Sequence, residues 1–245
     1  MFQYYIEWIS RSRAPVKAFI FDTETTGYQE NRGLIEVGYM EVVRLRPFEI
    51  GPSVVQRFNP GRPSTLGALA THHIADHELS DCPSSDQFVF PANMVYLIAH
   101  HSQFDFETLG SPQAIKQICT LALAREAWPN LDSHKLGALM YFLDPLNAKA
   151  RLKEAHSTEA DIQLCATLLE RLVTELQLNS FEALWEASEK AKTIKSFTFG
   201  KYKGKTFAEV KAKDPSYIQW CIGPEGLGND KEAIRQALID FLGKV

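Results

Sequence analysis

The 245-residue chain has the composition of a globular protein, with 45% hydrophobic and 23% charged residues. Its net charge of −4 argues against binding to nucleic acid through bulk positive charge. The charge is uneven, because residues 1–194 carry 17 Lys/Arg against 24 Asp/Glu, whereas residues 195–245 carry 9 against 6. A surface that attracts phosphate is therefore expected in the C-terminal segment, unless these lysines form an ordinary solvated surface.

The cysteines and the apolar stretches bear on the cellular compartment of the protein. Its four cysteines lie far apart, without zinc-ligand spacing, and we interpret them as reduced thiols of a cytoplasmic protein. No stretch approaches the roughly 20 apolar residues of a membrane span. The aromatic start of the chain lacks a small-residue cleavage site, so we predict neither export nor membrane insertion.

The hydrophobic pattern predicts strands first and then strands that alternate with helices. The expected strands cover residues 16–22, 34–45 and 54–58, joined by turns as a meander, and then residues 94–99 and the start of 118–128. The expected helices cover residues 66–73, 104–109, the rest of 118–128, 134–143 and 159–176. This order is typical of an α/β layered fold with a mixed sheet flanked by helices.

The last sixty residues form a separate part of the sequence. A polar helical stretch over 186–192 is interpreted as part of a connector, and the alternating aromatic and polar residues of 196–207, around two glycines, predict a β-hairpin. Helices are expected near 207–212, 215–221 and 231–242. We therefore predict an N-terminal extension (1–15), a main domain (16–184), a connector (185–194) and a small α+β C-terminal domain (195–245).

Two carboxylates at the end of the first strand are the most informative feature. Asp22 and Glu24 lie two residues apart, so in a strand both point to the same face. Two crowded carboxylates repel one another unless a cation lies between them, and such oxygen ligands suit Mg²⁺ or Mn²⁺. Taken alone, the pair could equally cap a solvated turn.

Two further acids follow apolar segments in the same way. Asp105 is placed where a strand leads into a helix, and Asp161 falls on the apolar face of the long helix that begins near residue 159. An unpaired charge on an apolar face is costly. A metal site shared with the first pair would compensate for that cost.

These segments together resemble the DnaQ-like 3′–5′ exonucleases, the DEDD superfamily, which have an RNase H-like fold. Residues 21–27, 100–105 and 156–161 match the three motifs of that family in order, and the step from His156 to Asp161 marks the DEDDh subgroup with a histidine base. The segments 197–205 and 214–220 resemble the C-terminal part of the exodeoxyribonuclease X group, so the similarity covers roughly residues 16–245.

The resemblance implies a metal-dependent phosphodiester hydrolase that removes 5′-mononucleotides from the 3′ ends of single-stranded or duplex DNA, in DNA repair or end processing. Two Mg²⁺ or Mn²⁺ ions would be held by four acids and His156 would be the catalytic base, because imidazole accepts a proton near neutral pH. The implied metal ligands are Asp22, Glu24, Asp105 and Asp161.

Substrate contacts are expected at three further positions. The resemblance places main-chain groups of Thr25 at the terminal 3′ hydroxyl and His72 on the helix that flanks the nucleotide. Tyr28 could stack on the terminal base, or could pack on its own loop. In the tail, Lys201, Lys203 and Lys205 could follow phosphates, or could be the surface of a small domain with an aromatic core.

Two departures from the family pattern adjoin catalytic positions. Position 101 is His where the family usually has Asn, and position 158 is Thr where a small Ala is usual. Two alternatives stay open: an exoribonuclease of the RNase T type that trims RNA 3′ ends, and an inactive nucleic-acid-binding module on the same fold. No residue in the sequence senses the 2′-hydroxyl that separates RNA from DNA.

Overall fold

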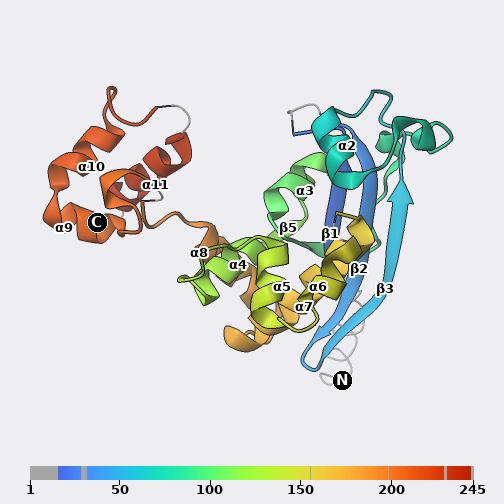
Figure 1. Cartoon of the computed structure of the whole chain (residues 1–245). Helices are drawn as coiled ribbons and strands as arrows, with labels where there is room; N and C mark the ends of the chain where they lie inside the picture. The colour runs from blue at the N-terminus through green and yellow to red at the C-terminus, as the bar shows by residue number, and fades with distance from the viewer. Residues whose placement is uncertain (1–15, 29–31, 155, 198, 229–230, 244–245) are drawn as a thin grey trace, which may run out of the picture. The chain divides into compact units, whose positions relative to one another are not determined.

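The chain divides into two compact units, one ending at Glu189 and the other beginning at Lys190, and each is described by itself. The computed structural model describes residues 16–28, 32–154, 156–197, 199–228 and 231–243 (Figure 1). The expected extension over 1–15 therefore lies outside the described residues. Within the described ranges, no helix combines the length and the apolar character needed to cross a membrane.

The larger unit is built on a five-stranded mixed sheet. Its strands are β1 (Lys17–Thr25), β2 (Leu34–Leu45), β3 (Phe48–Arg57), β4 (Met94–Ala99) and β5 (Lys116–Cys119), in the order β3-β2-β1-β4-β5. The first three form the predicted meander of antiparallel strands, whereas β1–β4 and β4–β5 pair in parallel. Short runs rich in Val, Ile, Leu and Phe suit a central strand covered on both faces, as β1 is.

Helices and 3-10 turns connect these strands. The helices are α2 (Leu66–His72), α3 (Ser102–Thr108), α4 (Thr120–Ala127), α5 (Leu136–Leu143), α6 (Ala148–Arg151), α7 (Thr158–Glu175) and α8 (Phe181–Lys192). The 3-10 turns cover Asp76–Leu79, Ser85–Gln87 and Leu152–Glu154. Each helix expected in this unit is present, and β3 begins earlier than predicted, at Phe48.

Helix α7 packs on β1 and β2 and forms the main hydrophobic core with α4 and α5 (Figure 1). Ile20 of β1 points into this core, whereas Phe19 and Phe21 point to the other face, where a second cluster rich in aromatic rings includes Phe106 of α3. The alternation of β1 therefore puts Asp22 and Glu24 on the face that α7 covers.

Helix α8 is longer than the polar stretch that predicted it. Leu184 is fully buried in the main core, and the Oγ of buried Ser188 accepts a hydrogen bond of 2.8 Å from the Cys119 N–H at the end of β5. The division between the two units falls within this helix, between Glu189 and Lys190. Part of the expected connector is thus a helix packed on the sheet.

The smaller unit holds three helices around an aromatic core. They are α9 (Phe207–Lys213), α10 (Pro215–Ile222) and α11 (Glu232–Gly243). A capping box of Thr206 and Glu209 begins α9, and Asp214 caps α10, with Pro215 at its first position. All three helices were predicted.

The predicted β-hairpin over 196–207 is present only as a short antiparallel pairing. The backbone N–H of Phe197 donates to the Lys205 carbonyl at 2.9 Å, that of Gly204 donates to the Phe197 carbonyl at 2.7 Å, and an antiparallel bridge joins Ser196 and Thr206. Among the described residues the two arms are too short to form strands, and a 3-10 turn over Gly200–Tyr202 lies between them. Phe197 and Phe207 are buried in the core of the unit, with their ring centroids 5.1 Å apart. Gly200 and Gly204 adopt the positive φ values that the turn requires.

Candidate active site

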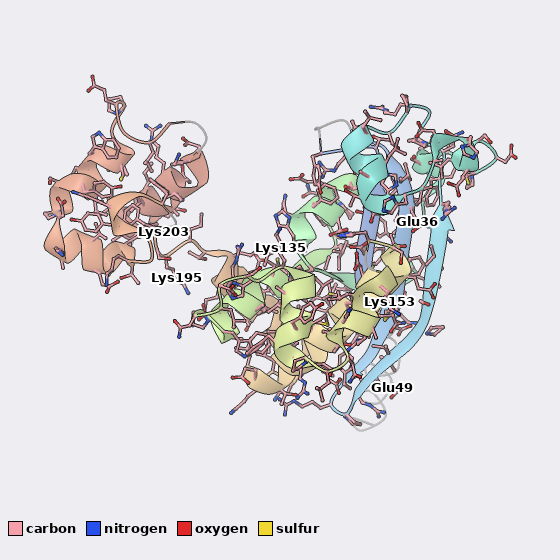
Figure 2. All side chains as sticks on the ribbon, in the orientation of Figure 1. Glu36, Glu49, Lys135, Lys153, Lys195 and Lys203 are labelled. Atoms are coloured by element: carbon pink, nitrogen blue, oxygen red, sulfur yellow. The ribbon has the colours of Figure 1, made fainter. Side chains whose placement is uncertain are left out.

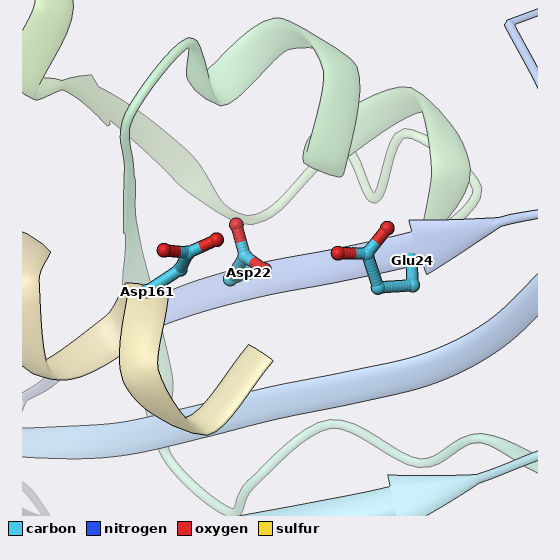
Figure 3. Close-up of side chains that lie close together, drawn as sticks. All are labelled: Asp22, Glu24 and Asp161. Carbon is cyan, nitrogen blue, oxygen red and sulfur yellow. The ribbon is translucent and has the colours of Figure 1, made fainter. Parts of the chain in front are cut away.

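Three carboxylates converge at the end of β1. Asp22 and Glu24 project from the strand toward Asp161 in the first turn of α7 (Figure 3). Each residue offers an oxygen, and these three oxygens all lie within 4.8 Å of one another. Acids separated by more than 130 positions in sequence are thus brought into one group, as the sequence predicted.

The start of α7 places Asp161 and His156 together. The Ser157 side chain caps the helix by accepting from Ala160 N, and His156 just before it adopts φ 71°. In this conformation the His156 backbone N–H donates to Asp161 Oδ2 at 3.2 Å. The histidine side chain is exposed and lines the same cleft as the carboxylates.

Asp105 approaches the group from α3. Its carboxylate is only 3% exposed, and Oδ1 accepts a hydrogen bond of 2.8 Å from the Thr23 hydroxyl of β1. This bond fixes the carboxylate beside the strand that carries Asp22 and Glu24. All four predicted acids therefore line one cleft.

The pKa values of the buried acids are raised above their usual range. Burial and then repulsion by Asp105 and Asp161 hold the pKa of Asp22 well above its usual range. Burial, followed by repulsion from Asp161, raises the pKa of Glu24 to about 8. Burial raises the pKa of Asp105 to about 7 against the opposing hydrogen bond from Thr23. A divalent cation bound between the carboxylates would offset both the cost of burying their charges and the repulsion between them, so the donor set fits Mg²⁺ or Mn²⁺.

The predicted substrate contacts surround the same cleft, an open space of about 270 Å³. Thr25 is buried and its hydroxyl donates to the Gly27 carbonyl at 2.8 Å, which holds the turn after β1. Tyr28 is 81% exposed, and its ring centroid lies 5.7 Å from that of Phe104. The guanidinium carbon of Arg32 lies 4.3 Å from the centroid of the Phe104 ring, so the second aromatic ring at this end of the cleft is packed against Arg32.

The ring of His72, at the end of α2, is oriented by a hydrogen bond from the backbone of Ile74. The side chain is buried, and Nδ1 accepts a hydrogen bond of 3.0 Å from the Ile74 N–H. Burial lowers the pKa of His72, which favours the neutral ring. Because Nδ1 is the acceptor, Nε2 carries the proton, and this buried atom has no hydrogen-bond partner in the described structure.

The two histidines before α3 have different environments. Burial lowers the pKa of His100 to about 4, and its ring nitrogens lie 3.0 Å from Thr120 Oγ1 and 2.9 Å from the His134 carbonyl. His101 is exposed at φ 78° and makes no side-chain cap bond. Asn, Asp and His are the residues other than Gly that most often adopt this left-handed conformation, so His101 suits the backbone at this position.

The tail lysines belong to the smaller unit. Lys201 Nζ lies 2.9 Å from Asp214 Oδ2 and 4.9 Å from the centroids of the Tyr202 and Tyr217 rings. Lys205 lies 3.9 Å from Glu209, and Lys203 is exposed on the same turn (Figure 2). The aromatic residues between them form the core of the unit.

Sequence reasoning missed one acid beside the site. Glu36 of β2 is 5% exposed and lies opposite Glu24 in the β1–β2 register, so the two share a face. A glutamate inside the otherwise apolar run of residues 34–37 was the available signal. The roles of Thr23 and Phe104 were also missed, because Thr23 acts through Asp105 and Phe104 acts through Tyr28, and each partner is distant in sequence.

Acids gathered at the end of the first strand of a mixed sheet, around an open cleft, define a class of metal-dependent nucleases. Comparison with known proteins agrees with this class. The model of the Exonuclease family matches residues 19–169, and the chain belongs to this family. The Exodeoxyribonuclease X-like C-terminal family matches residues 197–224. Exonucleases of this family typically use divalent metals.

Individual relatives include exodeoxyribonuclease 10 of Escherichia coli K12, 28% identical over 82% of this chain and 88% of that protein. A PolC-type DNA polymerase III of Bacillus cereus is 27% identical over 66% of this chain but only 12% of its own length.

Solved structures agree on the RNase H-like fold. Exonuclease X bound to 5′ overhanging duplex DNA matches with a TM-score of 0.57 at 23% identity, over 70% of this chain and 99% of that one. E. coli exonuclease I with a dT13 oligonucleotide matches at 0.53 and 15% identity, over 66% of this chain and 42% of that one.

Proposed function

We propose that this chain is a 3′–5′ exodeoxyribonuclease that releases 5′-mononucleotides from DNA ends. The observation that carries the proposal is the group of carboxylates from β1, α3 and α7 in one cleft, three of them with oxygens within 4.8 Å. The DNA substrate rests on the relatives, since the E. coli relative is named an exodeoxyribonuclease and the exonuclease X structure holds duplex DNA.

Asp22, Glu24, Asp105 and Asp161 would hold two divalent cations, Mg²⁺ or Mn²⁺. Such ions supply charge stabilisation to the phosphoryl group and lower the pKa of water. His156 takes the proton as a water oxygen attacks the phosphorus, and the bond from phosphorus to the 3′ oxygen breaks. The exposed position of His156 at the cleft leaves room for that water.

Three residues would hold the terminal nucleotide. The backbone turn that Thr25 supports presents main-chain groups to the 3′ hydroxyl, and Tyr28 stacks on the terminal base with Phe104 behind it. His72 would offer its Nε2–H to a phosphate or sugar oxygen, since the residue lines the cleft and this buried atom has no partner among the described residues. A buried donor of this kind favours a ligand that accepts its hydrogen bond.

Lys201, Lys203 and Lys205 of the smaller unit would bind the DNA backbone. Replacing a lysine that binds a phosphate reduces the salt slope of DNA binding by about 1. Lys203→Ala is therefore expected to flatten that slope, with Lys149→Ala of the larger unit as the control. An unchanged slope would make these lysines the ordinary surface of the small unit.

The test of the proposed function is digestion of end-labelled DNA with Mg²⁺, Mn²⁺ or chelator. A 5′ label should give a ladder that shortens one nucleotide at a time, and a 3′ label should appear at once as a mononucleotide. Asp105→Asn should abolish both, whereas Asp86→Asn, in an exposed turn, should not. Matched single-stranded, duplex and RNA substrates run together identify the preferred polymer. Faster digestion of RNA would overturn the DNA assignment, and binding of an intact strand would indicate a module without catalysis.

A further inference from the structure

The first residue of α7 is tied to the sheet by a buried polar bond. Thr158 is fully buried, and its hydroxyl donates to Glu36 Oε1 at 2.8 Å. The other carboxylate oxygen of Glu36 accepts from Arg57 Nε, also at 2.8 Å. Both oxygens of a nearly inaccessible carboxylate are thus engaged, and its charge is paired with a guanidinium. Figure 2 labels Glu36, the central member of this group.

The bond lies at the point where α7 comes closest to β2. Thr158 packs on Gly38, where an added Cβ would come within 2.7 Å of the Thr158 Cβ. In the β1–β2 register Gly38 lies opposite Asp22, and Glu36 lies opposite Glu24. The glycine therefore allows the helix to approach the strand, and the Thr158 hydroxyl then fixes it there.

Thr158, the first residue of α7, stands between two functional residues. His156 lies two positions before it, outside the helix, and Asp161 follows it by three positions; the 3.2 Å bond from His156 N to Asp161 Oδ2 joins the two. Because this bond connects His156 to the first turn of the helix, a shift of Thr158 displaces both. A misplacement of about 1 Å can cost an enzyme roughly 100-fold in rate.

We propose that Thr158, Glu36 and Arg57 form a positioning lock that fixes the first turn of α7, and with it Asp161 and His156, against Asp22 and Glu24. The inference rests on the proposed function for its catalytic consequence. Glu36 acts in this group as a positioning residue, because its two oxygens accept bonds from Thr158 and Arg57.

The experiment compares Thr158→Val, which keeps the branched shape but removes the hydroxyl, with Thr158→Ser, which keeps the hydroxyl. Thr158→Ala is added in case the Val side chain prevents folding. The matched control is Thr174→Val on the exposed side of the same helix, whose hydroxyl bonds only to the Glu170 carbonyl among the contacts that the structure gives it. All variants are made in the full chain.

Two measurements do not depend on catalysis. Amide hydrogen exchange at residues 159–161 should be faster by about tenfold in the Val and Ala variants, and the Mn²⁺ dissociation constant measured by titration should rise by a similar factor. Thr158→Ser should restore both to within about twofold, and Thr174→Val should change neither. Unchanged exchange and Mn²⁺ binding in the Val and Ala variants, or a Ser variant that behaves like Val, would overturn the lock.

Kinetics then separate positioning from substrate binding. With DNA, Thr158→Val should lower kcat by about tenfold or more and leave KM within about twofold, because the cleft surfaces that hold the nucleotide are unaltered. A rise in KM with unchanged kcat would contradict the lock. A wild-type chain that binds Mn²⁺ but cuts no DNA would refute the proposed function alone, since exchange and Mn²⁺ titration still test the lock.

Discussion

Replacing Glu24 by Gln should stabilise the protein when no divalent cation is present. The carboxyl has a pKa of about 8 in the folded chain against an ordinary 4.5, because of burial and then repulsion from Asp161. An acid whose pKa is raised on folding contributes stability below its unfolded pKa and loses that contribution as pH rises through the folded value. In chelator, wild-type stability should therefore fall between about pH 4.5 and pH 8.

The size of the effect follows from the same pKa values. At pH 7 the interval above the unfolded pKa is about 2.5 pH units at roughly 1.4 kcal/mol each, or about 3–4 kcal/mol at most. Glu24 is partly exposed, and solvent screening reduces this figure, so we expect a gain of about 1–3 kcal/mol for Glu24→Gln. For a chain of this size the Tm should rise by about 3–10 °C.

The assay is thermal and chemical unfolding at pH 5 and pH 7, with chelator or with Mg²⁺. Mg²⁺ should stabilise the wild type and do so less for Glu24→Gln, which has lost a ligand. Glu175→Gln, at the exposed end of α7, should change neither result. If Glu24→Gln in chelator at pH 7 is no more stable than the wild type, burial and repulsion of the Glu24 carboxyl do not destabilise the fold. If Mg²⁺ stabilises Glu24→Gln as much as it stabilises the wild type, Glu24 is not a ligand.

Four further substitutions test individual parts of the structure. Asp161→Asn should abolish mononucleotide release with an unchanged circular dichroism spectrum, and a wild-type rate would remove it from the site. His156→Ala should lose at least ~100-fold at neutral pH and recover partly in alkaline buffer, where hydroxide replaces the base; full neutral activity contradicts this. Tyr28→Ala should raise KM by roughly fivefold or more, whereas Tyr28→Phe should not. Phe207→Ala should destabilise the smaller unit by about 3–5 kcal/mol, measured by hydrogen exchange in α10.

The sequence predicted the sheet because its strands carry a strong local signal. β1 and β4 are short apolar runs that end in polar turns, and the long amphipathic α7 has a regular spacing of apolar residues. The four acids that line the cleft were proposed from their positions, where an element begins or ends or on an apolar face, together with the resemblance of their segments to the family motifs. Local pattern was enough for the strands and for α7, but not for joining the acids into one site.

Features that depend on contacts between distant residues were not predicted. The alternation around Phe197 predicts a longer hairpin than the short antiparallel pairing that forms, and the packing of its ring against Phe207 and Tyr217 in the core of the unit depends on residues distant in sequence. Glu36 resembles an ordinary polar residue of a strand until Arg57 and Thr158 are placed on its two oxygens. The orientation that leaves Nε2 of His72 unpaired among the described residues depends on a hydrogen bond from the Ile74 N–H to Nδ1, which sequence periodicity does not report.

The close approach at Gly38 has a consequence for the evolution of the family. An added Cβ at position 38 would lie 2.7 Å from the Thr158 Cβ and 3.0 Å from the Thr158 backbone carbonyl carbon. Every residue except glycine carries a Cβ, so a smaller side chain such as alanine at position 158 makes no room at position 38. Homologues whose first helical turn lies this close to the strand should therefore keep glycine at the position of Gly38, whichever residue they have at that of Thr158.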